Sequence, residues 1–64
     1  MYENILYEVA GGVATITLNQ PDKRNALTRQ MIADLVQAFD DLHGERRVRA
    51  VILTGSGPAF CAGM

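Results

Sequence analysis

The order of hydrophobic patterns along the chain limits its possible folds more than any other feature. In "ALTRQMIADLVQAFDDLHG", apolar residues recur every three or four positions, which places them on one face of an amphipathic helix. We expect Thr28 to be the N-cap of this helix and Gly44 to be its C′ residue. Such a helix must bury its apolar face against a second layer. The predicted apolar face consists of Met31, Ile32, Leu35, Val36, Phe39 and Leu42.

A β-hairpin is predicted before the helix. Residues 5–9 and 13–18 are rich in β-branched and aromatic side chains and are separated by "AGG". Glycine accepts the positive φ that a tight turn needs. In "VATITL", Ala14, Ile16 and Leu18 fall on one face and the two threonines fall on the other. We therefore expect one face of this hairpin to be buried.

A third strand is predicted after the helix. There, the charged stretch "ERRVR" leads into "AVILT" at residues 50–54, a continuous apolar run. Runs of this kind are typical of strands that are covered on both faces. A hairpin, a helix and then a buried strand indicate a parallel crossover connection. The predicted fold class is therefore α/β.

The length of the chain indicates a part of something larger. A chain of 64 residues buries only about 60% of the surface that it exposes when unfolded. Its single cysteine excludes an internal disulfide, and Cys61 with the lone His43 cannot make a zinc site. No linker or internal repeat divides the sequence. We expect residues 1–64 to be one segment of a single domain.

Composition narrows the possible partners. The chain is 48% hydrophobic and 20% charged, with a formal net charge of −1, a balance that gives no general attraction to nucleic acid or to an anionic membrane. It has no run of 18 apolar residues, and its start, "MYENILYEV", lacks the basic region of a signal peptide. The predictions are a cytoplasmic location and no nucleic-acid or membrane partner.

Several single residues invite a catalytic role, but structural roles explain them better. Cys61 has no nearby base in the sequence to form a thiolate, so we expect a small buried filler. His43 falls at the C-terminus of the predicted helix, where a cation is favoured by the helix dipole. Asp34, Asp40 and Asp41 fall on its outer face, away from any apolar pocket that would separate their pKa values. We expect them to form a solvated surface.

Two loops carry stronger signals. Lys23 and Arg24 are adjacent cations just before the helix, a place that suits a phosphate group, although adjacent basic residues in loops are usually only solvated. The second loop, "TGSGPAFCAGM" at residues 54–64, lacks the spacing of a dinucleotide-binding motif or a P-loop. Its small residues let a ligand approach main-chain N–H groups, as an oxyanion hole requires. An ordinary strand-to-helix connection is the alternative for this loop.

The two loops together resemble a known family. "VATITLNQPDKRNALT", the helix with "AFDDL", and then "VRAVILTGSGPAFCAG" resemble, in that order and spacing, the N-terminal part of the crotonase superfamily, also called the enoyl-CoA hydratase/isomerase family. The resemblance covers residues 2–64. The opening "MYE" and the phrases "RNAL" and "AFCAG" are also similar to 4-chlorobenzoyl-CoA dehalogenases within that superfamily.

The resemblance implies a fold and an activity. Family members fold as a spiral of ββα turns, assemble as trimers or pairs of trimers, and process acyl-CoA thioesters by stabilising an enolate or a related oxyanion. Coenzyme A is then part of the substrate, and no separate cofactor or metal is implied. Two backbone N–H groups form the oxyanion hole. The first would belong to Met64, and the second would come from a later segment that this chain lacks.

The same resemblance implies roles for five further residues in binding the CoA ester. Arg24 matches a position where a basic side chain meets CoA phosphate, and Lys23 is the second cation beside it. Ala26 lies in the loop that flanks the CoA chain. Ala62 matches a position whose main chain contacts adenine, and Gly63 is the glycine of the "AFCAG" motif that precedes the oxyanion-hole residue.

The chain departs from the family in its length. Family members are several times longer, so the chain is expected to be the N-terminal fragment of one crotonase-like domain, inactive alone, whose partner is the remainder of the same polypeptide. The acid, base or nucleophilic residues of the family lie beyond residue 64, which leaves hydratase, isomerase and dehalogenase open. A non-catalytic module that binds CoA esters or assembles subunits is the alternative from a different class.

Overall fold

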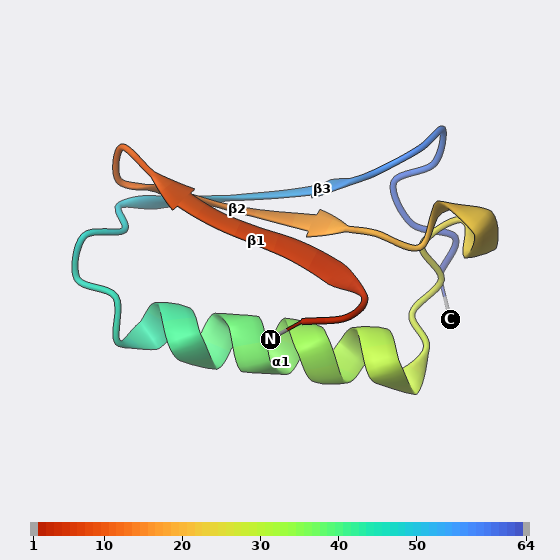
Figure 1. The fold of residues 1–64 in the computed structure, drawn as a ribbon, viewed down its shortest axis with the longest axis horizontal. Coiled ribbons are helices and arrows are strands. Elements are labelled where there is room, and N and C mark those ends of the chain that lie inside the picture. Colours follow the sequence, from red (N-terminus) through yellow and green to blue (C-terminus); the bar gives the residue numbers. More distant parts are fainter. Residues whose placement is uncertain (1, 64) are drawn as a thin grey trace.

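The fold consists of a three-stranded sheet packed on one long helix (Figure 1). It was obtained as a computed structural model, and the structure describes residues 2–63. The elements in chain order are β1 (Ile5–Ala10), β2 (Val13–Leu18), the short 3₁₀-helix η1 (Pro21–Lys23), α1 (Arg29–His43) and β3 (Ala50–Gly55). The strands lie in the order β1-β2-β3. These two layers confirm the predicted α/β class.

The hairpin of β1 and β2 closes on two glycines. The strands pair antiparallel up to Ala10 opposite Val13, so Gly11 and Gly12 alone form the connection. Their φ values are +58° and +81°, and two positive φ values match the twist of a two-residue hairpin. The predicted hairpin is confirmed, with its first strand one residue longer than expected.

The connection from β2 to β3 is the predicted parallel crossover. The pairing runs from Val13 opposite Ala50 to Leu18 opposite Gly55. In the sequence α1 falls between these two strands, and in space it lies on one face of the sheet (Figure 1). Parallel strands end at the same edge of a sheet. The segments that follow β2 and β3, residues 19–28 and 56–63, therefore start side by side.

The core lies between α1 and one face of the hairpin. Ala14, Ile16 and Leu18 are buried, so the predicted buried face of β2 is confirmed. From the helix, Met31 and Ala38 are fully buried. Ala38 was missing from the predicted apolar face, because a small side chain adds little to a hydrophobic pattern.

Half of the predicted apolar face of α1 does not reach this core. Leu35 and Leu42 pack against it, but Ile32, Val36 and Phe39 are exposed, Val36 by 64%. The helix packs chiefly on β1 and β2, and the apolar stripe is wider than the surface that this narrow sheet offers. The expectation that all six residues face the core was therefore wrong.

The third strand is also more exposed than predicted. Val51, Ile52 and Leu53 are exposed by 44%, 51% and 43%, whereas the continuous apolar run predicted a strand covered on both faces. β3 lies at the edge of the sheet and α1 packs chiefly on the other two strands. Within residues 2–63, neither face of β3 is fully covered.

The helix begins at the predicted N-cap, but Gly44 occupies a different capping position from the one predicted. The Thr28 hydroxyl accepts a hydrogen bond from the Met31 N–H at 3.2 Å, which confirms the N-cap and satisfies one of the free N–H groups of the first turn. Gly44 is the C-cap itself, with φ −90°, and not a C′ residue of positive φ. His43 lies in the last turn and is exposed, as expected.

The acidic face of α1 is only partly the solvated surface that was predicted. Asp34 accepts hydrogen bonds from the Glu3 N–H at 3.0 Å and the Asn4 N–H at 2.7 Å. The Asp41 carboxylate accepts a hydrogen bond from the Tyr2 hydroxyl. These bonds hold the segment before β1 against the helix, a long-range contact that the helical pattern alone could not indicate. Asp40 is exposed, in agreement with the prediction.

Candidate functional site

The candidate site lies at the edge of the sheet where β2 and β3 end. The 3₁₀-helix η1 follows β2, and residues 56–63 follow β3, so both lie at the same end of the molecule (Figure 1). Every predicted binding residue that the structure describes belongs to these two segments or to the turn between η1 and α1: Lys23, Arg24, Ala26, Ala62 and Gly63. Met64, the predicted oxyanion-hole residue, lies outside the described residues.

The turn around η1 presents the two predicted cations to solvent. The Lys23 N–H donates to Gln20 O at 3.0 Å, and the Arg24 N–H donates to Pro21 O at 3.0 Å. Arg24 and Asn25 both have left-handed backbones, with φ of +54° and +57°. This conformation is uncommon outside glycine, although asparagine tolerates it better than most residues. The result is a tight turn from which Lys23 and Arg24 are exposed.

Asn25 is the functional candidate that sequence reasoning missed. Its side chain is fully buried, and its Oδ1 accepts a hydrogen bond from the Gln20 N–H at 2.8 Å. Its Nδ2 lies 3.0, 2.9 and 3.0 Å from the carbonyl oxygens of Ser56, Ala59 and Phe60. Two amide hydrogens serve three acceptors, so at least one bond is shared. The only sequence signal was an asparagine within a turn, which favours the left-handed backbone but does not reveal its distant partners.

Two glycines of the second loop are explained by contact with this turn. A Cβ on Gly55 would lie 2.5 Å from Phe60 O and 2.8 Å from the Nδ2 of Asn25. A Cβ on Gly57, which has φ +78°, would lie 2.8 Å from the Cβ of Pro21. Only a residue without a side chain fits at such distances. We expected the small residues of this loop to let a ligand approach the main chain. Contact with the turn around η1 is a second reason for glycine at positions 55 and 57.

One backbone hydrogen bond joins the two predicted binding segments. The Leu27 N–H donates to Gly63 O at 2.9 Å, and the Thr28 N–H donates to Ala26 O at 2.9 Å. Gly63 has φ +89°. This bond brings Gly63 beside the loop that contains Ala26. Ala62 is exposed next to it.

Cys61 is held between this segment and the core. It is partly buried, packs against the core cluster, and its Sγ accepts a hydrogen bond from the Gly63 N–H at 3.4 Å. This position agrees with the predicted role as a filler, although the burial is incomplete. Among residues 2–63, no three His, Cys, Asp or Glu side chains form a group that could hold a metal ion.

In the loop after β3, three carbonyl groups are oriented by hydrogen bonds to one side chain. The carbonyl groups of Ser56, Ala59 and Phe60 point toward the Asn25 amide. In a planar trans peptide the N–H points opposite to the carbonyl. The N–H groups that follow these three carbonyls therefore point away from Asn25. N–H groups that are held in a fixed direction suit an anion or a polarised carbonyl oxygen as a ligand.

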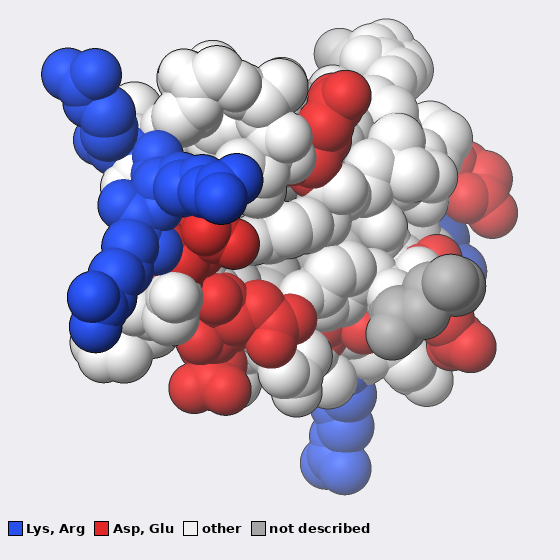
Figure 2. Space-filling model, turned by 60° about the vertical axis from the view of Figure 1, so that its left-hand side comes forward, with Lys and Arg blue, Asp and Glu red and all other residues white. Residues whose placement is uncertain are grey.

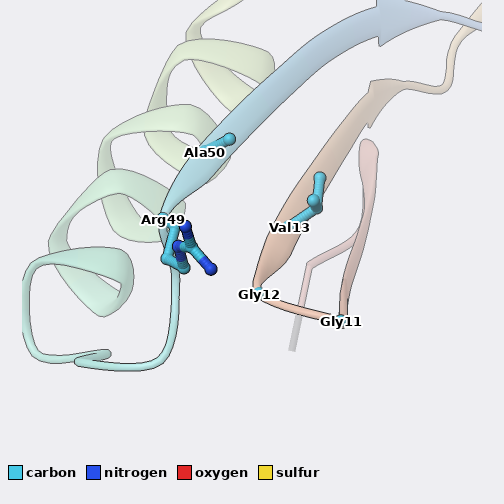
Figure 3. Close-up of a pocket in the computed structure, with 5 residues that line it drawn as sticks. All are labelled: Gly11, Gly12, Val13, Arg49 and Ala50. Carbon is cyan, nitrogen blue, oxygen red and sulfur yellow. The ribbon is translucent and has the colours of Figure 1, made fainter.

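The opposite end of the sheet carries a cavity and a cluster of cations. The open cavity has a volume of about 310 Å³ and is lined by Gly11, Gly12, Val13, Arg49 and Ala50 (Figure 3). Figure 2 shows positive side chains gathered at this end, where Arg46, Arg47 and Arg49 are exposed. None of the predicted site residues lines this cavity. The hollow and the candidate site are thus at different ends of the molecule.

No helix within residues 2–63 is long and apolar enough to cross a bilayer.

Comparisons with known proteins agree with the fold and with the two motifs. Residues 8–64 match the family model described as "Enoyl-CoA hydratase/isomerase". The chain is 49% identical over 55 residues to "Probable enoyl-CoA hydratase 1, peroxisomal" of Arabidopsis thaliana, which covers 86% of this chain and 21% of that protein. It is 48% identical over 62 residues to "Probable enoyl-CoA hydratase EchA14" of Mycobacterium tuberculosis, covering 97% and 24%.

Solved structures show the same arrangement. The crystal structure of an enoyl-CoA hydratase/isomerase from Mycobacterium paratuberculosis matches with a TM-score of 0.95 and 46% identity, over 98% of this chain and 25% of that chain. The corresponding structure from Xanthobacter autotrophicus Py2 matches with a TM-score of 0.95 and 44% identity, over 100% and 24%. The chain spans about a quarter of the length of these relatives. It belongs to the enoyl-CoA hydratase/isomerase family of the crotonase superfamily.

Proposed function

We propose that the chain is the N-terminal part of an enzyme that transforms acyl-CoA thioesters as a lyase or isomerase. The observation that carries this proposal is the hydrogen bond from the Leu27 N–H to Gly63 O. It joins the turn that bears two exposed cations to the segment whose main chain would meet the thioester. A phosphorylated thioester needs both features, a cation for one end and N–H donors for the other.

Each predicted site residue has a part in this proposal. Lys23 and Arg24 attract the phosphates of CoA, and the main chains of Ala26 and Ala62 contact the rest of that ligand. Gly63 precedes the amide of Met64, which donates to the thioester oxygen as negative charge develops there. The carbonyl of Gly63 accepts a hydrogen bond from the Leu27 N–H at 2.9 Å.

Further parts of the proposal concern the whole protein. Coenzyme A is part of the substrate, and no other cofactor takes part. The enzyme is cytoplasmic and assembles as a homotrimer or hexamer, with the second oxyanion donor and the acid or base supplied by a later part of the same polypeptide. The relatives from Arabidopsis thaliana, Mycobacterium tuberculosis and Mycobacterium paratuberculosis are named as enoyl-CoA hydratases or a hydratase/isomerase, which supports these two activities above release of halide from a CoA thioester.

The first test separates phosphate binding from folding. In the complete protein, Arg24→Ala should weaken binding of a CoA ester about tenfold, and should leave binding of the matching pantetheine thioester unchanged, because only the CoA ester carries nucleotide phosphates. Arg46→Ala, an equal loss of charge at the far end of the sheet, is the control and should change neither affinity. Equal weakening for both ligands after Arg24→Ala would contradict the proposed contact.

The second test concerns the oxyanion donor. Proline has no amide hydrogen, so Met64→Pro should lower kcat about 10²–10³-fold, as the loss of one such donor does elsewhere. Met64→Leu keeps the N–H and should retain most activity. A folded Met64→Pro protein with normal turnover would exclude this amide, whereas tight CoA-ester binding by a wild-type protein without any turnover would favour a non-catalytic binding module.

A further inference from the structure

We propose that Asn25 is the positioning residue of this site. This inference rests on the proposed function, and it adds a residue that neither directly contacts the substrate nor belongs to the predicted binding set. The Asn25 side chain forms hydrogen bonds within both segments of the site: its Oδ1 accepts from the Gln20 N–H, and its Nδ2 donates to carbonyl groups of the loop after β3.

The hydrogen bonds of Asn25 orient peptide groups in the loop after β3. Its Nδ2 contacts the carbonyls of residues 56, 59 and 60, so one amide holds three peptide units of the loop at once. The unit at Phe60 also includes the N–H of Cys61, whose residue contacts Gly63. A shift of the Asn25 amide would therefore rotate the segment that leads to the thioester.

The surroundings leave little freedom for that amide. Asn25 is fully buried, its backbone is in the left-handed region with φ +57°, and Gly55 approaches it so closely that a Cβ there would lie 2.8 Å from Nδ2. An alternative rotamer would remove the Nδ2 donor from the carbonyls of Ser56, Ala59 and Phe60, which costs free energy for each carbonyl that stays unpaired. The side chain is thus held in one orientation.

The sharpest variant is Asn25→Asp, which keeps the size of the side chain and the acceptor for the Gln20 N–H. The ionised carboxylate has no hydrogen to donate and would face three carbonyl oxygens, whereas the protonated acid has one O–H donor. Burial and these neighbours raise the pKa of such a carboxyl. Activity of this variant should therefore recover as the pH falls.

The experiment uses the complete protein, at a temperature well below unfolding, with a CoA ester as substrate. At about pH 8, kcat of Asn25→Asp should fall about 10²-fold, the loss expected when reacting groups are misplaced by about 1 Å. The dissociation constant of the CoA ester should change less than about fivefold, because Lys23 and Arg24 are long and adjustable. The ratio of variant kcat to wild-type kcat should rise as the pH is lowered toward about 5.

Two further variants make the result decisive. Asn25→Gly accepts the left-handed backbone without strain but has no amide, so it should lose kcat at every pH and show no acid recovery. Gln37→Glu, the same amide-to-acid change on the exposed face of α1, should leave kcat unchanged. A folded Asn25→Gly or Asn25→Asp protein with kcat within about twofold of wild type at pH 8 would overturn the proposal.

A readout without turnover separates this inference from the proposed function. In NMR spectra of Asn25→Asp, the amide signals of Cys61 and Gly63 should shift with a common pH midpoint, because protonation restores the donor that orients their segment. Unchanged signals across the titration would overturn the role of Asn25. A wild-type protein that neither binds nor transforms CoA esters would contradict the proposed function instead.

Discussion

The two ends of the sheet both depend on residues with positive φ, but they are held in different ways. At the hairpin end, Gly11 and Gly12 connect two strands that are neighbours in the sequence, and a Cβ on Gly11 would meet no atom within 4 Å. At the site end, the bonds from Asn25 reach carbonyls 31 to 35 residues away. At Gly11 the first end is determined locally, although the next residue, Gly12, accepts a hydrogen bond from the Arg49 N–H at 2.7 Å. The second end depends on long-range contacts of the Asn25 side chain itself.

This difference has a consequence for how each end tolerates change. A local turn responds mainly to the backbone preference of its own residues. A turn that is hydrogen-bonded to a distant loop is also destabilised by substitutions that change the distance between the turn and the loop. Substitutions at the glycines of the two ends test this distinction in the complete protein.

Gly55→Ala should give the largest loss of stability. Its Cβ would lie 2.5 Å from Phe60 O and 2.9 Å from the Cα of Phe60, and backbone atoms cannot move aside as a flexible side chain can. We expect the free energy of unfolding to fall by about 3 kcal/mol, the upper part of the usual range for overpacking. Urea denaturation measures this change. Gly44→Ala is the control, because its Cβ would have no neighbour closer than 4.0 Å, and a loss of similar size there would remove the contrast.

Gly57→Ala should cost more than Gly11→Ala, although both residues have positive φ. The left-handed backbone costs an alanine about 1–2 kcal/mol at either position. Only at Gly57 would the new Cβ also lie 2.8 Å from Pro21, which adds about 1 kcal/mol or more. Thermal unfolding of the two variants side by side measures the difference. Equal losses would mean that the site end is no more constrained than the hairpin.

Gly11→Asn should change the stability by less than about 0.5 kcal/mol, because Asn-Gly is a preferred pair in two-residue hairpin turns. The side chain would extend into open space. Urea denaturation against the Gly11→Ala variant provides the measurement. A loss as large as that of alanine would show that the hairpin end depends on more than backbone preference.

Tyr2→Phe should give the smallest effect, because its contact lies outside both ends and is solvent-exposed. The hydrogen bond to Asp41 raises the pKa of Tyr2 to about 12 and lowers the pKa of Asp41. A raised tyrosine pKa stabilises the fold below the ordinary value of 10.0 and loses that contribution as the pH rises through about 12. The lowered Asp41 pKa stabilises the fold above its ordinary value and loses that contribution as the pH falls through the folded value.

NMR titration of the Asp41 carboxyl measures this contact directly. In Tyr2→Phe its pKa should rise only part of the way toward the ordinary value, because Gln37 still donates to the same carboxylate. An Asp41 pKa that does not change in Tyr2→Phe would show that the tyrosine hydroxyl has no part in the shift.

The sequence predicted what depends on neighbours in the chain. The hairpin at Gly11 and Gly12, the Thr28 cap and the parallel crossover follow from short patterns, and all three are confirmed. The bonds from Asn25 to the loop after β3 were not predictable in this way, because the three carbonyl partners lie 31 to 35 residues away and are placed by where β3 ends. The same reasoning explains why Val36 and β3 were wrongly predicted to be buried within this segment. A hydrophobic pattern indicates that a side chain favours burial, but not which segment packs against it.

The outer edge of β3 has a consequence for the synthesis of the protein. Within residues 2–63, β3 is the last strand of the sheet and its residues Val51, Ile52 and Leu53 are exposed. An exposed, apolar edge strand is a template on which another chain can add a strand. A ribosome makes this segment before any residue that follows it. During that interval, β3 of one nascent chain can pair with β3 of a neighbouring chain on the same messenger RNA. The rate of translation and the presence of a chaperone would then affect the yield of soluble protein.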